Sequence, residues 1–344
     1  MRVALFVALT ACLLVRGGHA AAQTSAAPPA PAVGAPAASS TAPSVRPATP
    51  SATDPRFDYR LRPRALGPGV WVVEGAEDDF ALANGCNIIN TGFIATGAGV
   101  VVINTGVSRR YGEQLRAAIA SVTAEPVVKV LNLNHHPDYF LGNQAFDPVT
   151  LAATPATVDG IRAESAAYED NLYRLCGDWM ADTRTVAPAP VLQPGPLTVG
   201  GRTLELIELD GHTRSDLVVV DRTSGVVFAG GLVFVDRAPT APHADLDRWS
   251  RSLDRLGTLE WRAMVPSHGP VVSDRRGLAQ TRDWVDWLQR TLRASAAAGL
   301  ELNEVTALPR PARFATMKAW STEHPRTIAV QYPRYERDAL TRRR

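Results

Sequence analysis

The sequence predicts an α/β protein in which two mixed β-sheets pack face to face and helices cover the outside of the pair. Three observations lead to this prediction. Strand-like and helix-like segments alternate from about residue 56 onward. Residues 202–234 then change to the two-residue period of β-strands. Each half of the region runs sheet first and helix after, which suits two sheets within one domain.

The first half reads as a sheet followed by helices. Strands are predicted at 69–75, 87–96 and 99–106, a helix at 109–122, a buried strand at 126–134 and a long helix or helix pair at 155–180. The glycines at 97 and 99 indicate a turn between the second and third strands. The buried strand is indicated by its apolar run, and α/β folds place their chemistry beyond the C-terminal ends of such strands.

The second half repeats this order. Strands are predicted at 202–209, 216–222 and 225–234, an amphipathic helix at 246–256, a short strand at 262–266 and a closing helix at 277–299. The segment Thr-Ser-Gly at 223–225 is short enough to join two strands as a hairpin. Both halves therefore contribute one sheet and the helices that cover it.

The two ends of the chain differ from the middle. A basic start, the apolar run at 3–15 and the small residues at 17–22 predict a cleaved secretory signal peptide over 1–20, and hence a periplasmic or secreted protein. Residues 21–55 are rich in alanine and proline and predict a disordered linker. The rest divides into a domain at 56–300 and a C-terminal extension at 301–344 that we expect to pack on it.

Charge and cysteine content restrict the partners and the redox chemistry. The net charge is +2, which gives no general reason to expect nucleic acid or an anionic membrane as a partner, and the signal run is too short for a stable membrane span. Two cysteines, Cys86 and Cys176, remain after signal removal. An exported protein can hold them as a disulfide or as two buried thiols, and the sequence leaves both alternatives open.

Four metal-binding side chains follow predicted strands on three separate loops. They are His136 and Asp138 in "NHHPDYFLGN", His212 in "DGHTRSD" and His268 in "VPSHGPV". Zinc takes imidazole nitrogens and carboxylate oxygens at about 2.0–2.2 Å, usually from loops at one sheet edge. The spacing therefore predicts a metal site made of these four residues. Asp138 and His212 are the expected catalytic residues, because a carboxylate or a metal-free imidazole can orient a water molecule or take its proton.

The motifs resemble those of the metallo-β-lactamase superfamily. "VLNLNHHPDYFLGN", "GHTRSDLVVV", "VFAGGLVF" and "VPSHGPV" occur in that family's order, and "GFIATGAGVVVINTG" looks like its opening hairpin. The segments at 57–76, 168–180 and 230–249 are most similar to the secreted branch called quinoprotein relay system zinc metallohydrolases. The resemblance implies a four-layer αββα sandwich with one or two zinc ions, and a zinc-bound hydroxide that attacks an ester, thioester or amide.

Residue by residue, the resemblance implies an altered metal site. The family motif His-x-His-x-Asp-His corresponds to Asn134, His136, Asp138 and Tyr139, the bridging aspartate to Gly231, and a supporting carboxylate to Asn104. A neutral amide is a poor zinc ligand, and a tyrosine must ionise against a pKa of about 10. Neither site keeps three ligands, so we expect at most one zinc ion, with a metal-free site as the alternative.

Two further histidines receive weaker expectations. His135 occupies the variable position of the motif, and its side chain is expected to point away from the cleft. His243 lies on a loop expected to border the cleft, either as a substrate contact or as a surface residue without a role.

The sequence thus predicts an exported hydrolase with a depleted metal centre. The resemblance implies a connection with a periplasmic quinoprotein system, with a pyrroloquinoline-quinone-dependent dehydrogenase or its cytochrome as the partner. The alternative is a non-catalytic binding or maturation factor that keeps the fold without zinc. The substrate and the oligomeric state do not follow from the sequence.

Overall fold

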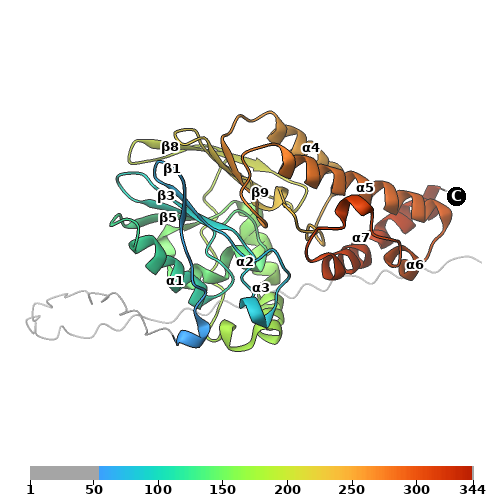
Figure 1. Cartoon of the computed structure of the whole chain (residues 1–344), viewed down its shortest axis with the longest axis horizontal. Helices are drawn as coiled ribbons and strands as arrows, with labels where there is room; N and C mark the ends of the chain where they lie inside the picture. The colour runs from blue at the N-terminus through green and yellow to red at the C-terminus, as the bar shows by residue number, and fades with distance from the viewer. Residues whose placement is uncertain (1–53, 343–344) are drawn as a thin grey trace, which may run out of the picture. The chain divides into compact units, whose positions relative to one another are not determined.

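The computed structural model describes residues 54–342. The predicted signal peptide and residues 21–53 of the predicted linker lie outside the described residues. The described part contains a six-stranded and a five-stranded sheet, packed together with helices outside, which confirms the predicted fold class (Figure 1). None of the helices described is both long and apolar enough to cross a lipid bilayer.

The first sheet is mixed and has its strands in chain order. It contains β1 (Arg64–Gly67), β2 (Val70–Val73), β3 (Thr91–Ala95), β4 (Val100–Ile103), β5 (Val127–Leu131) and β6 (Leu151–Ala152). The pairs from β1 to β4 are antiparallel, and β4, β5 and β6 run parallel. Ile103 pairs with Leu131, so β4 and β5 end at the same level.

The second sheet is also mixed. Its strands are β7 (Gly195–Val199), β8 (Arg202–Leu209), β9 (Asp216–Asp221), β10 (Val226–Phe228) and β11 (Ala263–Val265), in the order β11-β10-β9-β8-β7. β9 is antiparallel to both of its neighbours, and β10 and β11 are parallel. Consequently β8, β10 and β11 run in one direction and end at one edge of this sheet.

Helices cover both outer faces. They are α1 (Arg109–Ala120), α2 (Pro137–Phe140), α3 (Pro155–Cys176), α4 (Leu246–Gly257), α5 (Arg276–Ala298), α6 (Leu302–Thr306) and α7 (Trp320–Arg342). Short 3-10 helices lie at Pro55–Phe57, Leu82–Asn84, Leu141–Ala145, Pro148–Thr150, Gly177–Met180, Gly230–Leu232 and Ala312–Phe314. Side-chain oxygens cap α1, α3 and α4, at Ser108, Thr154 and Asp245, so these helices begin where backbone N–H groups find acceptors.

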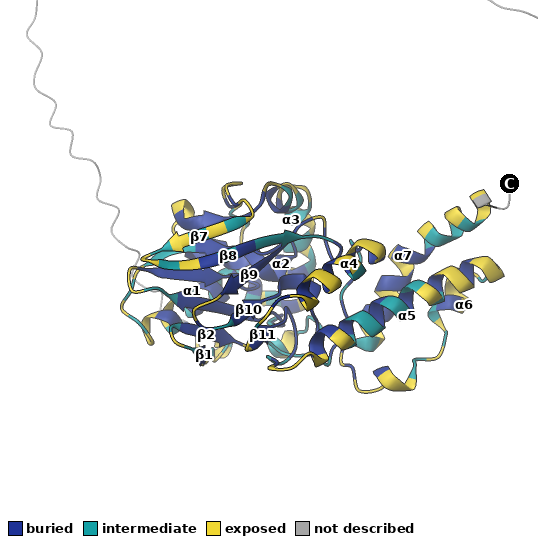
Figure 2. Cartoon of the chain, turned by 90° about the horizontal axis from the view of Figure 1, so that it is seen from above, coloured by how far each residue is buried: buried dark blue, intermediate teal, exposed yellow. Residues whose placement is uncertain are grey.

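Three hydrophobic cores separate the layers. One lies between the sheets, and it contains Val101 and Val219. Another lies between the first sheet and α1 and α3 and contains Val102, and the third packs α4, α5 and α7 on the second sheet and contains Val218. The central strands are therefore buried on both faces, which explains their continuous apolar runs (Figure 2).

Several predicted strands are shorter than expected, and two of them end early because their outer residues belong to loops of the site. The strand predicted at 87–96 begins only at Thr91, since the Asn90 N–H donates to the Ser267 carbonyl oxygen at 2.8 Å. The strand predicted at 225–234 ends at Phe228, where the chain turns into the 3-10 helix Gly230–Leu232. Both departures lie beside the loops that carry His268 and Gly231.

The two cysteines form a disulfide bond. Cys86 and Cys176 are fully buried, and their Cα atoms lie 6.1 Å apart. The bond joins the segment before β3 to the C-terminal end of α3 and closes a separation of 90 residues. It resolves the alternative that the sequence left open.

Candidate functional site

The second sheet presents three loops at one edge. β8 leads into the loop of His212, β10 into Gly231 and β11 into His268. Since these strands share a direction, their C-terminal ends meet at this edge, as expected for α/β sites.

The loop after β5 reaches the same edge from the first sheet. The Leu133 N–H donates to Asn104 Oδ1 at 3.1 Å, and the Leu133 carbonyl oxygen accepts from the Leu217 N–H at 2.8 Å. Asn134 Oδ1 accepts from the backbone N–H of His136 at 2.9 Å, just before α2 begins. Asn104 thus supports this loop, and the contact with Leu217 fastens it to the second sheet.

His212 is held by a carboxylate. Its Nδ1 lies 2.9 Å from Asp216 Oδ1, and Asp216 also accepts from the Asn134 amide at 3.2 Å and the Thr213 N–H at 2.7 Å. The carboxylate favours a proton on Nδ1, which leaves the lone pair on Nε2. His212 Nε2 is buried and has no hydrogen-bond partner among residues 54–342. This nitrogen is therefore free to accept a proton or to bind a metal ion.

His268 is held by the other predicted carboxylate. His268 Nε2 lies 3.0 Å from Asp138 Oδ2, and its Nδ1 lies 2.9 Å from Ser267 Oγ. The His268 ring stacks on Phe234 with centroids 5.0 Å apart, and His212 contacts the same ring at 5.6 Å. Burial lowers the pKa of His268, although the hydrogen bond to Asp138 opposes this shift.

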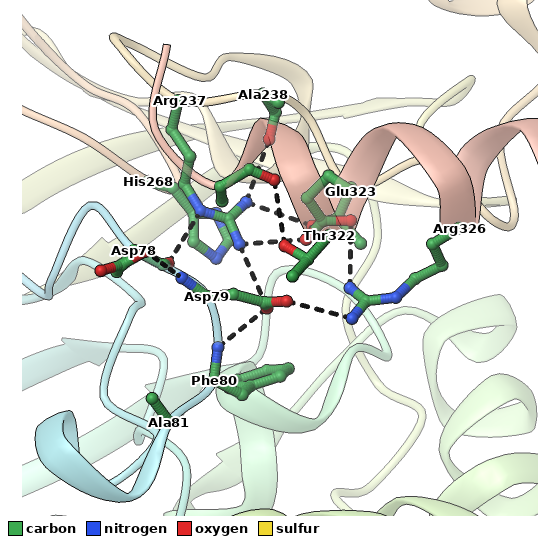
Figure 3. Close-up of polar contacts among 12 residues, drawn as sticks. Asp78, Asp79, Phe80, Ala81, Arg237, Ala238, His268, Thr322, Glu323 and Arg326 are labelled. Atoms are coloured by element: carbon green, nitrogen blue, oxygen red, sulfur yellow. Dashed lines mark hydrogen bonds and ion pairs between the residues drawn. The ribbon is translucent and has the colours of Figure 1, made fainter. Parts of the chain in front are cut away.

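An ionic cluster lies next to His268, and its central residues, Arg237 and Glu323, are buried (Figure 3). Arg237 is fully buried and lies 3.0 Å from Glu323 and 3.7 Å from Asp79, while Arg326 contacts the same two carboxylates at 3.0 and 3.1 Å. Glu323 and Arg326 belong to α7, whereas Asp79 belongs to the loop after β2. The cluster therefore joins the C-terminal helix to the rim of the site, and the charge of Arg237 helps to lower the pKa of His268.

The four predicted metal-site residues lie close together. His136 and His212 have ring centroids 4.7 Å apart, His212 and His268 both contact the ring of Phe234, and His268 hydrogen-bonds with Asp138. Burial lowers the pKa of His136 well below its usual value, with further contributions from His212 and other nearby histidines. Asp138 and His212, the expected catalytic residues, thus each hydrogen-bond to a neighbouring side chain rather than to each other.

Three positions around these residues offer little to a metal. An ideal Cβ at Gly231 would lie 2.0 Å from His212 Nδ1 and 2.7 Å from the Asn134 amide nitrogen, so His212 fills the space of a side chain there. Asn134 uses its amide group on Asp216 and on the His136 backbone. Burial, followed by the charge of Asp138, raises the pKa of Tyr139 well above 10, so its phenol stays protonated.

The structure contradicts the expectation that His135 points away from the site. His135, His136 and His243 each offer a ring nitrogen, and these atoms all lie within 4.8 Å of one another. His136 Nε2 lies 3.0 Å from His243 Nδ1, and His243 Nε2 lies 3.1 Å from Glu164 of α3. The double histidine in the sequence was the available signal. His243 was expected on a loop that borders the cleft, whereas nothing in the sequence places Glu164 beside it.

The histidines differ in exposure. His135, His136, His212 and His268 are all buried, whereas 32% of the His243 side chain is exposed. The cluster therefore meets the protein surface at His243.

The comparisons with known proteins agree with this architecture. A model of the metallo-β-lactamase superfamily matches residues 84–268, more than half of the chain, and the chain belongs to this superfamily. Members of the superfamily usually bind zinc. The matched region begins just before the disulfide cysteine of the opening segment and ends at His268.

One curated relative and several solved structures are similar to the chain. Acyl-coenzyme A thioesterase MBLAC2 from Bos taurus is 26% identical over 213 residues, which are 56% of this chain and 65% of that protein. The metallo-β-lactamase from Pontibacter korlensis has a TM-score of 0.54 at 22% identity and covers 66% of this chain and 99% of its own. Metallo-β-lactamase IND-7 has a TM-score of 0.52 at 17% identity, over 66% of this chain and 98% of its own. At these identities the two structures show the fold alone.

Proposed function

We propose that the protein is an exported hydrolase of metallo-β-lactamase fold that cleaves an ester, thioester or amide bond with at most one metal ion. The observation that supports it most is the uncommitted, buried Nε2 of His212, oriented by Asp216 and close to His136. A similar thioesterase makes a thioester the first substrate class to test.

A bridged pair of zinc ions does not fit the donor groups. Such a pair needs ions about 3.5–4 Å apart and several anionic or imidazole ligands on each ion. Gly231 offers no carboxylate, and His212 fills the space that one would occupy. Asn134 is engaged with Asp216, and Tyr139 stays protonated. We therefore place the metal content at one ion or none.

The chain's own groups can activate a water molecule. In this proposal the lone pair of His212 Nε2 takes the proton of the attacking water, while Asp216 holds Nδ1–H and stabilises the imidazolium. Asp138, held by His268, orients the water or the leaving group. A metal ion bound beside these residues would lower the pKa of the water molecule that it holds toward about 7.

Export is part of the proposal. The buried Cys86–Cys176 disulfide suits an oxidising compartment, in agreement with the signal peptide expected at 1–20. The connection to a quinoprotein dehydrogenase or its cytochrome comes from the sequence resemblance and remains a proposal.

A binding or maturation role is the second candidate. It is favoured by the contact of His268 with Asp138 and of His136 with His243, which satisfies ring nitrogens without a ligand. In this case the cleft would hold a partner segment or a cofactor precursor and would carry out no hydrolysis.

Turnover of aryl esters and acyl thioesters separates the two candidates. We expect His212→Ala to reduce turnover at least about 100-fold, the low end of what general-base catalysis contributes. His324→Gln is the matched control, because His324 is buried among Trp287 and Trp320 and outside this site. Equal background rates for the wild type and His212→Ala would reject the hydrolase and favour the binding role.

A further inference from the structure

Three histidine rings form a compact triangle beside the residues that the superfamily motif selects. The centroid distances are 5.3 Å for His135–His136, 4.9 Å for His135–His243 and 5.2 Å for His136–His243. Each of the three rings offers one nitrogen, and these nitrogens lie within 4.8 Å of one another. No other group of three or more histidine, cysteine, aspartate or glutamate residues in the described part of the chain meets this limit. Imidazole nitrogens at such spacing are the usual ligands of zinc and related transition metals.

A carboxylate behind the triangle directs one of its nitrogens inward. Glu164 Oε2 lies 3.1 Å from His243 Nε2 and also accepts the Tyr168 hydroxyl at 2.5 Å. With Nε2–H donated to Glu164, the lone pair of His243 is on Nδ1, the atom that lies 3.0 Å from His136 Nε2. Metal-binding histidines typically donate their outer N–H to a carboxylate in this way.

The third ring is fixed in place by the backbone of α3. An ideal Cβ at Gly160 would lie 2.6 Å from His135 Cγ, so the ring occupies the space that any other residue at 160 would need. His135 is only 5% exposed, and its Nε2 has no hydrogen-bond partner in the described part of the chain. Glu164 Oε1 lies 3.6 Å from His135 Nε2, which is too far for a hydrogen bond. A buried polar nitrogen without a partner is costly, and a bound ion would satisfy it.

We infer that His135, His136 and His243 form a single transition-metal site, best suited to Zn²⁺, that shares only His136 with the set predicted from the superfamily motif. Three histidines leave the fourth position of a tetrahedral ion open, which is the composition of catalytic zinc sites. The exposed edge of His243 gives solvent access to that position. The site would hold the single metal ion of the proposed hydrolase. A catalytic role of this ion rests on the proposed function, whereas the existence of the site does not.

Zinc titration of the full mature chain tests the site. The chelator-treated protein is titrated with Zn²⁺ against a chromophoric competitor, and Co²⁺ binding is followed by absorption. His135→Gln and His243→Gln should each weaken Zn²⁺ binding at least about 100-fold. This is more than a metal site typically loses when only a hydrogen-bond partner of a ligand is removed. His268→Gln is the matched control, because it keeps a donor toward Asp138, and it should change the affinity less than threefold. His136→Gln does not discriminate, since both sets contain it.

Gly160→Ala gives an independent reading, because it displaces the His135 ring without removing a ligand atom. It should weaken zinc binding at least tenfold, and thermal unfolding together with an intact disulfide would show that each variant is folded. The inference is overturned if the wild type binds no zinc, or if folded His268→Gln loses the ion while His243→Gln keeps it. Tight zinc at this site without hydrolysis would overturn the proposed function alone.

Discussion

The edge of the two sheets holds two groups of histidines that use their ring nitrogens differently. His212 and His268 each have a carboxylate within 3.0 Å, from Asp216 and Asp138. In the group of His135, His136 and His243 the rings contact one another edge-on or tilted, and of these only His243 has a carboxylate within 3.1 Å. Among the described residues, each group keeps a buried nitrogen without a partner, on His212 in the first group and on His135 in the second, but only in the second group do nitrogens of three rings lie within 4.8 Å of one another.

The comparison shows that motif position and ligand geometry are separate properties. His268 stands at a motif position, yet its Nε2 faces Asp138. His135 stands at a variable motif position, yet it is packed against Gly160 and directed toward two other histidines. A family motif therefore identifies which loops meet, and the packing of those loops decides which nitrogens remain available.

Acidification should destabilise the fold mainly through the second group, and this is the largest effect on stability that we expect. Burial, with repulsion from His243 second, lowers the pKa of His135 to about 4, and burial also lowers the pKa of His136. The unfolded chain binds these protons near pH 6.5, so stability is full above that pH and falls toward pH 4. The loss is about 1.4 kcal/mol per pH unit for each such histidine.

Urea unfolding between pH 8 and pH 4.5, with a chelator present, measures this loss. Burial raises the pKa of Asp79 and of Asp221, but arginine contacts together with hydrogen bonds outweigh it, so both pKa values lie below the usual value. These carboxylates therefore lose their stabilising effect only below about pH 4. A loss of stability between pH 6.5 and pH 4.5 is therefore assigned to the histidines. A free energy of unfolding that stays constant from pH 7 to pH 5 would contradict the burial of neutral rings.

Gly231→Asp adds a carboxylate next to His212 and so tests whether the first group can be made to bind a metal ion. The new side chain would collide with His212 Nδ1, and overpacking of this kind costs about 1–3 kcal/mol. We expect a lower free energy of unfolding and no second zinc ion in elemental analysis. Gly257→Asp is the control, since a Cβ there meets no atom within 4 Å. A stable variant with two zinc ions would show that the loops readily rearrange.

Glu164→Gln should weaken the second group without removing a ligand. The loss of an orienting carboxylate typically costs 10–100-fold in metal affinity. Zinc affinity should fall by that factor in competition titrations, while exposed Asp159→Asn on the same helix should leave it unchanged. If both variants bind zinc as the wild type does, Glu164 has no part in the site.

Most of the fold could be predicted from residue patterns. Central strands such as β4 and β9 are apolar on both faces, and α4 has a clear amphipathic face. The missed strands were the short β1 and β6 and the outer strand β7. β6 has only two residues, and β7 has no fully buried side chain, so neither has enough apolar residues to show a period.

The site could be predicted in part. The loops of His136, His212 and His268 follow strands and carry turn residues, so their meeting at one sheet edge was foreseeable. The loop of His243 was expected to border the cleft, but its contact with His136 was not foreseen, and neither was the position of Glu164, because both depend on how an irregular loop and the face of α3 approach the motif in space. The Gly160 contact is likewise a property of packing between distant segments.

The most direct test is the position of zinc in crystals of the full mature chain, located by anomalous scattering at the zinc absorption edge. The account predicts one peak, surrounded by ring nitrogens of His135, His136 and His243 at about 2.0–2.1 Å. Two peaks about 3.5–4 Å apart, bound by His212, His268 and Asp138, would contradict it.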